Sequence, residues 1–452
     1  MRFPTARELR LALERIATRP VESQPPSIAV LPFVNMGGDR EQEYFGDGLA
    51  EEIINALARI PGLKVTARTS AFSFKGKDAK IAQIASELGV EHILEGSVRK
   101  AGNRIRITAQ LIDAADGFPL WSERYDRELI DIFEVQEEIA GAIAGQLKVS
   151  LSGNTSRAHV PPFAAYEAFL EGRHYSNRLG RASLAKAFAC AQRALEIDSN
   201  SAESHEFLGA WHGMMAWTGL ADPGEMYAKG RAHLKRALQL AASVAEAHAL
   251  LGAFGGLGDY DWVQAAEHLE RALQLNCSLE VRRTYAWWHL RPLGRLEEAL
   301  AELEKVRQED PLSAFAWREI AHLLVLLRRF DEAADAAQHA LELEPGHTMA
   351  MFGLVEARLQ RGRTGEAIEI AESAARLSPG WLVVLAYLAL AYSFENRFGD
   401  AGLTLEEMHA LSGRGHANAT APASGHLASG DFDGCFEWLH RAIDQREPII
   451  TH

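Results

Sequence analysis

Small side chains recur at a fixed interval along the second half of the chain. They step by 34 residues, at Ala265, Ala299, Ala333, Ala367, Ala401 and Cys435. A second series follows seven residues after each, at Ala272, Val306, Ala340, Ala374, Met408 and Ala442. Because small residues let two helices cross closely, this period predicts stacked helix pairs, about eight of them, over residues 163–446.

The same two series extend toward the amino terminus with less regular spacing. Ala187 and Ala194 form one earlier step, and Gly230 and Ala237 form the next. Extra residues near 213–225 predict a longer connection there. Gly230 has no side chain to pack, so we expect it to weaken its helix pair.

A mixed pattern precedes the repeats, over residues 27–150. Short apolar runs typical of strands occur at 27–33, 63–67, 92–100 and 104–113. Helical spacing occurs at 46–60, 80–89 and 131–147. The order is strand, helix, strand, helix, strand, strand, helix, which predicts a small α/β layer domain. The predicted fold is therefore an α/β domain followed by an all-α solenoid.

The first 26 residues differ from both regions. Residues 1–17 predict a short amphipathic helix, and residues 18–26, rich in proline and polar residues, predict a linker.

Composition narrows the classes of function. The chain has 452 residues, a net charge of −14 and a pI of about 5.7. An acidic chain gains no counterion-release affinity for phosphate backbones, so we expect no nucleic-acid partner. The longest apolar run, Leu382 to Tyr392, is too short to span a bilayer, and the charged start lacks a signal core. Three cysteines without a CxxC pair indicate a reducing cytoplasm.

A search for catalytic and ligand-binding patterns finds none that predicts an enzyme. The chain lacks kinase motifs and GxSxG, and its glycine patch at 254–259 lies between two helices, where no phosphate cradle is expected. His205 and His212 are seven residues apart, which is the wrong spacing for a zinc helix. The charged segment at 121–129 is interpreted as docking a strand end onto a helix. We predict no catalytic residue, no cofactor and no metal.

The repeat resembles the tetratricopeptide repeat, whose unit is 34 residues. Residues 314–345 carry the resemblance most closely, with Trp317, Ala321, Phe330, Ala340 and Pro345 at the positions that this family uses. The resemblance implies a curved solenoid that binds protein or peptide partners.

Two further resemblances concern the segments before the repeats. Residues 27–150, including SIAVLPF and LGVEHILEGSVRK, are similar to the amino-terminal domain of the TolB translocation protein. The resemblance implies a place beside class III adenylate cyclase domains, serine/threonine kinase domains or winged-helix regulators in bacterial signalling proteins. Residues 1–17 resemble the last helix of a kinase domain, which implies a parent with a kinase output.

The first helix of each pair is expected to line the concave side of the solenoid. The residues predicted to face a partner there are Thr284, Trp288, Arg291, Phe315, Arg318, His322, Met349, Phe352 and Glu356. Aromatic anchors beside arginine suit a peptide groove. The sequence thus predicts a non-catalytic, cytoplasmic regulatory module coupled to a kinase or cyclase output. Two alternatives stay open: an enzyme that binds a small molecule or nucleotide through the α/β domain, and an architectural scaffold. The oligomeric state is left open.

Overall fold

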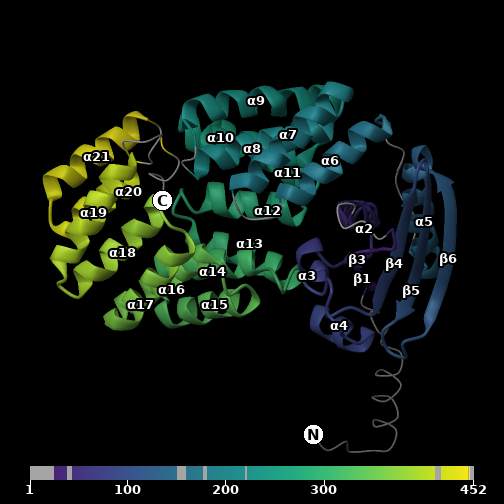
Figure 1. The fold of residues 1–452 in the computed structure, drawn as a ribbon, viewed down its shortest axis with the longest axis horizontal. Helices are drawn as coiled ribbons and strands as arrows, with labels where there is room; N and C mark the ends of the chain where they lie inside the picture. The colour runs from purple at the N-terminus through teal and green to yellow at the C-terminus, as the bar shows by residue number, and fades with distance from the viewer. Residues whose placement is uncertain are drawn as a thin grey trace, which may run out of the picture.

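The computed structural model describes residues 25–37, 43–149, 159–176, 181–218, 221–412, 419–445 and 447. Figure 1 shows a sheet with its covering helices on one side of the molecule and a curved array of helices on the other. The predicted fold class, an α/β domain followed by a helical solenoid, is confirmed. The predicted helix at 1–17 lies outside the described residues, as does most of the linker.

One mixed sheet forms the centre of the α/β domain. Its strands are β1 (Ser27–Val30), β2 (Val34–Asn35), β3 (Lys64–Val65), β4 (His92–Ala101), β5 (Arg104–Asp113) and β6 (Pro119–Glu128). They lie in the order β3-β1-β4-β5-β6, and β2 pairs with β4. The pairs of β1 with β3 and β4 are parallel, whereas β4–β5 and β5–β6 are antiparallel. Parallel pairs need a crossover helix, which explains the alternation in the first half of this domain.

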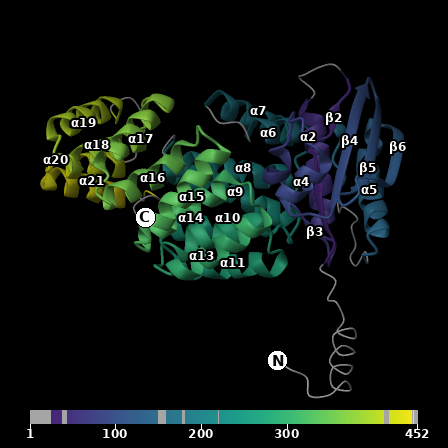
Figure 2. The same cartoon turned by 90° about the horizontal axis from the view of Figure 1, so that it is seen from below.

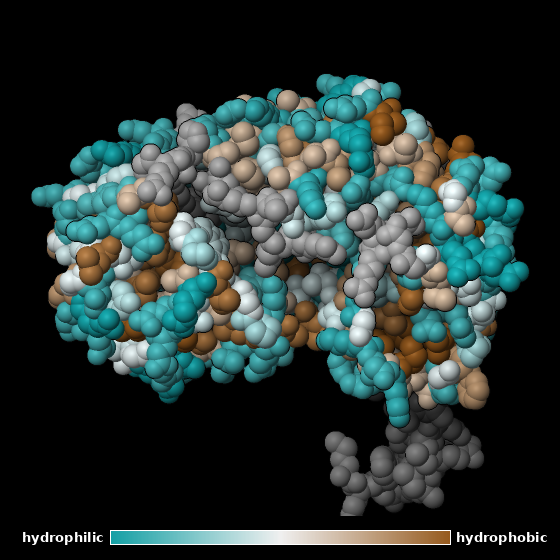
Figure 3. Space-filling model, viewed as in Figure 1, coloured by the Kyte–Doolittle hydropathy of each residue, from teal (hydrophilic) through white to brown (hydrophobic). Residues whose placement is uncertain are grey.

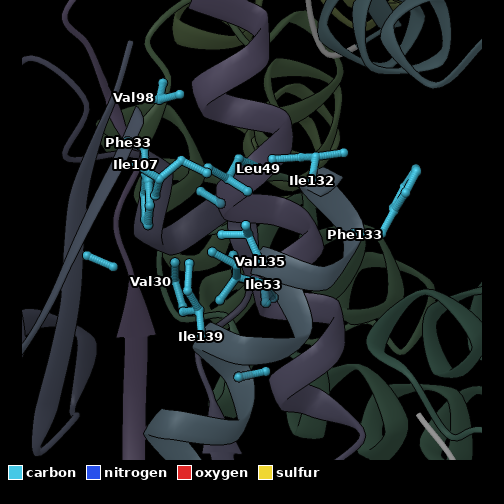
Figure 4. Packing of buried hydrophobic residues seen from close by; sticks show 14 of the residues in the cluster. Val30, Phe33, Leu49, Ile53, Val98, Ile107, Ile132, Phe133, Val135 and Ile139 are labelled. Atoms are coloured by element: carbon cyan, nitrogen blue, oxygen red, sulfur yellow. The ribbon is translucent and has the colours of Figure 1, made fainter. Parts of the chain in front are cut away.

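Helices cover both faces of this sheet. Helices α2 (Glu43–Ala58) and α5 (Ile132–Gln146) pack on one face, where Leu49 and Ile53 meet Val30, Ile107 and Ile139 (Figure 4). Helix α4 (Ile81–Leu88) covers the other face near β1 and β4. It ends at Gly89, whose φ of 66° is the left-handed conformation expected of this C-cap. Two short elements, α3 (Arg68–Phe72) and η2 (Leu129–Asp131), complete the domain.

Strand β6 differs from the sequence-based expectation. The segment 121–129 is not a docking loop, because residues up to Glu128 pair with the whole length of β5. Charged residues dominate this strand and only Tyr125 is buried, so the period-two apolar signal of a strand is nearly absent.

The solenoid consists of successive antiparallel helix pairs. The first helices of the pairs are α6 (Phe163–Ser176), α8 (Ala202–Trp217), α10 (Ala245–Asp259), α12 (Leu279–Tyr285) continued by η3 (Ala286–Leu290), α14 (Ala314–Leu326), α16 (Thr348–Gln360), α18 (Leu382–Phe394) and α20 (Thr420–Ser429). The second helices are α7 (Arg181–Ile197), α9 (Pro223–Leu240), α11 (Trp262–Leu275), α13 (Leu296–Glu309), α15 (Phe330–Leu343), α17 (Thr364–Leu377), α19 (Phe398–Ser412) and α21 (Phe432–Asp444).

Every member of the two small-residue series is buried between helices. Ala299, Ala333, Ala367 and Ala401 are fully buried, and Cys435 is 9% exposed. The close helix crossing that the 34-residue period predicts is therefore confirmed. Gly230 is a correction: a Cβ there would lie 2.7 Å from the Phe254 ring, so the glycine makes room for an aromatic side chain and does not weaken the pair.

The α/β domain docks on the solenoid through α2 and α6. A Cβ at Gly48 would lie 2.7 Å from Leu170 of α6, so only glycine permits this approach of the two helices. Buried acidic groups of α2 meet bases of α6 at the same interface: Glu51 pairs with Arg173, and Asp47 lies 3.4 Å from His174. Figure 2 shows the sheet beside the solenoid, with β6 on the side away from the repeats.

Candidate functional site

The nine residues predicted to line a groove lie on the first helices of three successive pairs. Thr284 and Trp288 belong to α12 and η3, Arg291 to the following turn, Phe315, Arg318 and His322 to α14, and Met349, Phe352 and Glu356 to α16. Several of them contact one another or a neighbour from the next pair. We call this row of contacts the inner row; it runs from Trp287 to Tyr387.

Two arginines of the inner row surround Trp287. The guanidinium carbons of Arg291 and Arg318 lie 4.1 and 4.6 Å from the centroid of its ring, within cation–π distance. Burial lowers the pKa of Arg291 to about 9, with a further contribution from the charge of Arg318. Burial likewise lowers the pKa of Arg318 to about 10. Two like charges are thus held close together where water solvates them poorly.

A buried carboxylate lies beside these cations. Glu319 is fully buried and accepts hydrogen bonds from Arg318, at 3.0 Å, and from Arg283 of α12, at 3.1 Å. Burial raises the pKa of Glu319, although both arginines act in the opposite direction. Glu319 therefore connects α12 to α14 and supplies negative charge to the arginine cluster.

His322 takes the neutral form in this setting. Its Nε2 lies 3.5 Å from a guanidinium nitrogen of Arg291, and its ring centroid lies 5.3 Å from that of Trp287. Burial, followed by the charges of Arg291 and Arg318, lowers its pKa to about 3. Because an arginine can only donate, the imidazole nitrogen is the acceptor.

The inner row continues into the next pair through Tyr387 of α18. The ring of Tyr387 stacks on Phe352 with centroids 4.3 Å apart. Its hydroxyl donates to Glu356 at 2.5 Å. Burial raises the pKa of both Tyr387 and Glu356, which favours their neutral forms.

The predicted residues divide into support and surface. Thr284, Arg291 and Phe352 are buried, so they lie beneath the open face of the groove and support it. Phe315 is 36% exposed and is the most open of the large apolar ones. The guanidinium of Arg318 lies 4.3 Å and that of Arg283 4.9 Å from the Phe315 ring centroid. An exposed aromatic ring flanked by two cations thus marks the accessible part.

Sequence reasoning missed three members of the inner row: Trp287, Glu319 and Tyr387. Glu319 and Tyr387 lie two repeat lengths apart, and Glu319 directly follows the predicted Arg318. The same 34-residue step, shifted by one, would have identified them. Trp287 directly precedes the predicted Trp288, whose ring instead stacks on Trp217 of α8.

A second connection between domain and solenoid lies at the start of α14. Ser70 of α3 donates through its backbone N–H to Asp310 at 3.0 Å, and its hydroxyl also pairs with this carboxylate. The same hydroxyl accepts from the N–H of Leu312 at 2.9 Å. Burial raises the pKa of Asp310. We call this set of bonds the clasp; it joins the α/β domain to the turn between α13 and α14.

The described residues offer little toward a small-molecule site. No group of three or more His, Cys, Asp or Glu side chains among them is placed to hold a metal ion. A cavity of about 20 Å³ lies beside Tyr166 and Ser204 and has room for about one water molecule. None of the described helices is both long and apolar enough to cross a membrane.

Two family models match parts of the chain. Residues 318–380 match the tetratricopeptide repeat, which confirms that resemblance. Residues 23–141 match the HilA/YgeH-like transcriptional regulator, second domain. The TolB resemblance of this region stays a prediction, and so does the kinase resemblance at 1–17.

One curated relative and several solved structures are similar to the chain. "Putative adenylate cyclase 3" of Rhizobium meliloti (strain 1021) is 44% identical over 214 residues, covering 44% of this chain and 36% of the relative. The chain thus spans about a third of that relative's length.

Among solved structures, a human IFIT1 dimer with m7Gppp-AAAA has a TM-score of 0.49 at 16% identity, covering 69% of this chain and 77% of that one. The tetratricopeptide-repeat protein YrrB has a TM-score of 0.28 at 18% identity, covering 42% of this chain and 92% of its own. Pseudomonas aeruginosa pilF has a TM-score of 0.33 at 19% identity, with 48% and 93% covered.

Proposed function

We propose that this chain is a non-catalytic regulatory module of a bacterial signalling protein, which binds a protein or peptide partner and influences an adenylate cyclase or kinase output in the cytoplasm. The tetratricopeptide-repeat match supports the binding part of the proposal. The similarity to a relative named as a putative adenylate cyclase supports the link to a cyclase rather than a kinase.

The observation that carries the proposal is the exposed face around Phe315. Phe315 offers an apolar anchor, and Arg283 and Arg318 lie over its ring. Arg318 and Arg291 both have lowered pKa values because their charges are buried close together. A carboxylate from a partner would relieve this repulsion, so the face favours a peptide with an apolar residue next to an acidic one.

The clasp provides a route from binding to output. Ser313 caps α14 by accepting from the N–H of Ala316, and Asp310 of the clasp lies three residues before Ser313. Phe315 lies in the first turn of the same helix. A partner that prefers one position of α14 therefore also favours one state of the clasp, which is what coupling requires.

The test is a direct binding measurement with a matched control. Peptides are selected against the full chain by phage display, and their affinities are measured by calorimetry. Phe315→Ala should weaken binding at least about tenfold, because it removes the central anchor. Phe436→Ala, which removes another exposed phenylalanine on the second helix α21, should leave the affinity unchanged.

Charge is tested by Arg318→Gln. Charge reversal at Arg318 would place a second buried carboxylate beside Glu319 and endanger the fold, since the Arg318 side chain is only 11% exposed. Arg318→Gln should lower affinity for acidic peptides more than for neutral ones. Equal binding by wild type, Phe315→Ala and Arg318→Gln would exclude the groove as the site.

A further inference from the structure

Strand β6 ends the sheet on the side away from the solenoid. Both cartoon views place it at the outer margin, and the surface there is hydrophilic (Figure 3). Among the residues that the structure describes, no strand pairs with its outer edge. The strand is ten residues long, and its one proline is the first residue. Most of its outer edge can therefore accept another strand.

The direction of each backbone group along β6 follows from its pairing with β5. The N–H of Leu129 donates to Asn103 at 3.0 Å, in the same register that pairs Tyr125 with Ile107. Hydrogen-bonded and non-hydrogen-bonded residues alternate in an antiparallel pair. Odd-numbered residues of β6 therefore point their N–H and C=O groups toward β5. The even-numbered residues, Ser122, Arg124, Asp126 and Glu128, point theirs outward.

The charges on β6 form a palindrome of inverted sign about Tyr125. Glu123 and Arg127 lie two residues on either side of it, and Arg124 and Asp126 lie one residue on either side. We propose that β6 pairs antiparallel with β6 of a second copy of this chain, about a two-fold axis at Tyr125, so that the two sheets become one. This proposal does not depend on the proposed function.

That register satisfies both backbone and side chains. Arg124 of each copy lies opposite Asp126 of the other, and the outward N–H and C=O groups of these two residues form the hydrogen-bonded pairs. Glu123 lies opposite Arg127 on the other face. Since the axis is two-fold, each favourable pair occurs twice. Opposite charges directly across a strand pair stabilise it, and like charges destabilise it.

The neighbouring registers are worse. Shifting the strands by two residues in one direction places Arg124 opposite its own copy, and shifting in the other direction does the same for Asp126. Shifts of one residue bring inward-pointing groups to the interface. In the favoured register Leu120, 45% exposed, also comes level with Ile130, 68% exposed, of the other copy. Charged edges usually prevent pairing between sheets, but here the charges match a second copy.

Sedimentation of the full chain tests the proposal. Wild type should move from 49.7 kDa toward twice that mass as concentration rises. Arg124→Asp places acidic residues opposite acidic ones across the axis, and Asp126→Arg places basic residues opposite basic ones, so each should raise the dissociation constant at least about tenfold. An equimolar mixture of the two variants should recover the dimer, because the introduced aspartate of one variant then meets the introduced arginine of the other.

The control is Arg99→Glu, which makes the same change of charge on β4, inside the sheet, and should dimerise as wild type does. Far-UV circular dichroism checks that each variant is folded. A wild type that stays at 49.7 kDa over the whole range would overturn the proposal, as would variants that dimerise as strongly as wild type.

Disulfide formation tests the register itself. Residues 123 and 127 of the two copies form a non-hydrogen-bonded pair, whose Cβ atoms lie about 4.5–5.5 Å apart, near the range a disulfide spans. With the exposed Cys277 changed to serine, a Glu123→Cys, Arg127→Cys double variant should cross-link between copies on oxidation. Glu123→Cys alone should not. Equal cross-linking by both would reject this register.

Discussion

The two halves of the molecule bury apolar surface with side chains of different size. The largest fully buried side chains of the α/β domain are Ile28, Leu49, Ile53, Leu57, Ile93, Leu94, Ile105, Ile107, Leu111, Ile132 and Ile139, whereas Phe254 is the one such residue from the described repeats. The repeats instead pack alanines at their helix crossings. A helix on a sheet leaves a wide layer that large aliphatics fill, but two helices in a repeat approach too closely for them.

This difference in size has a counterpart in connectivity. The core between the sheet, α2 and α5 is one continuous cluster that also reaches α6, whereas the repeats contain several smaller clusters, each shared by neighbouring pairs. We therefore expect a defect in the α/β core to loosen the whole domain, and a defect in a repeat to act on its neighbours.

The largest effect is expected from Ile53→Ala. Ile53 is fully buried on α2 between the sheet and α5, so the change leaves a cavity and should lower the free energy of unfolding by about 2–5 kcal/mol. Hydrogen exchange should show amides of β1, β4 and β5 losing protection together. Loss confined to α2 would contradict a single cooperative core.

A smaller and more local effect is expected from Ala333→Leu. Ala333 is fully buried where α15 crosses its partner, so the larger side chain should cost about 1–3 kcal/mol by overpacking. Exchange should increase in α14, α15 and α16 and remain unchanged in the sheet. Ala301→Leu, an exposed alanine on α13, is the matched control and should have almost no effect. Equal loss throughout the chain would remove the contrast between the two halves.

The smallest effect is expected where the two halves meet at the clasp. Ser70→Ala removes the hydroxyl that pairs with Asp310 and accepts from Leu312, which should cost about 1–2 kcal/mol. Exchange should rise in α3 and at the start of α14. Ser73→Ala, on the same turn, removes only a local bond to the carbonyl of Ser70 and serves as the control. Matching profiles for the two variants would show that the clasp does not hold the halves together.

Repetition decided which parts of the fold could be predicted from the sequence. A 34-residue step is visible without knowing any contact, so the helix pairs and their buried alanines were predictable. Gly230 was misjudged because its role depends on Phe254, a residue on another helix. Strand β6 was missed because an edge strand with one buried residue carries almost no apolar alternation.

The groove was predictable in its helices and not in its depth. The repeat placed Arg318 and His322 on the correct helix face, but which of the predicted residues lie beneath the surface depends on the packing of successive pairs. The clasp could not be predicted, since Ser70 and Asp310 are 240 residues apart and no local pattern relates them.

Because the clasp anchors the turn before α14, the array is fixed at two points: at α6 and at residue 310. Pairs α6 to α13 therefore behave as a braced arch, and changes of curvature are left to the cantilever formed by α14 to α21. Pulling on the carboxyl-terminal end should extend this cantilever as a soft spring first, and stiffness should rise once the load reaches the arch.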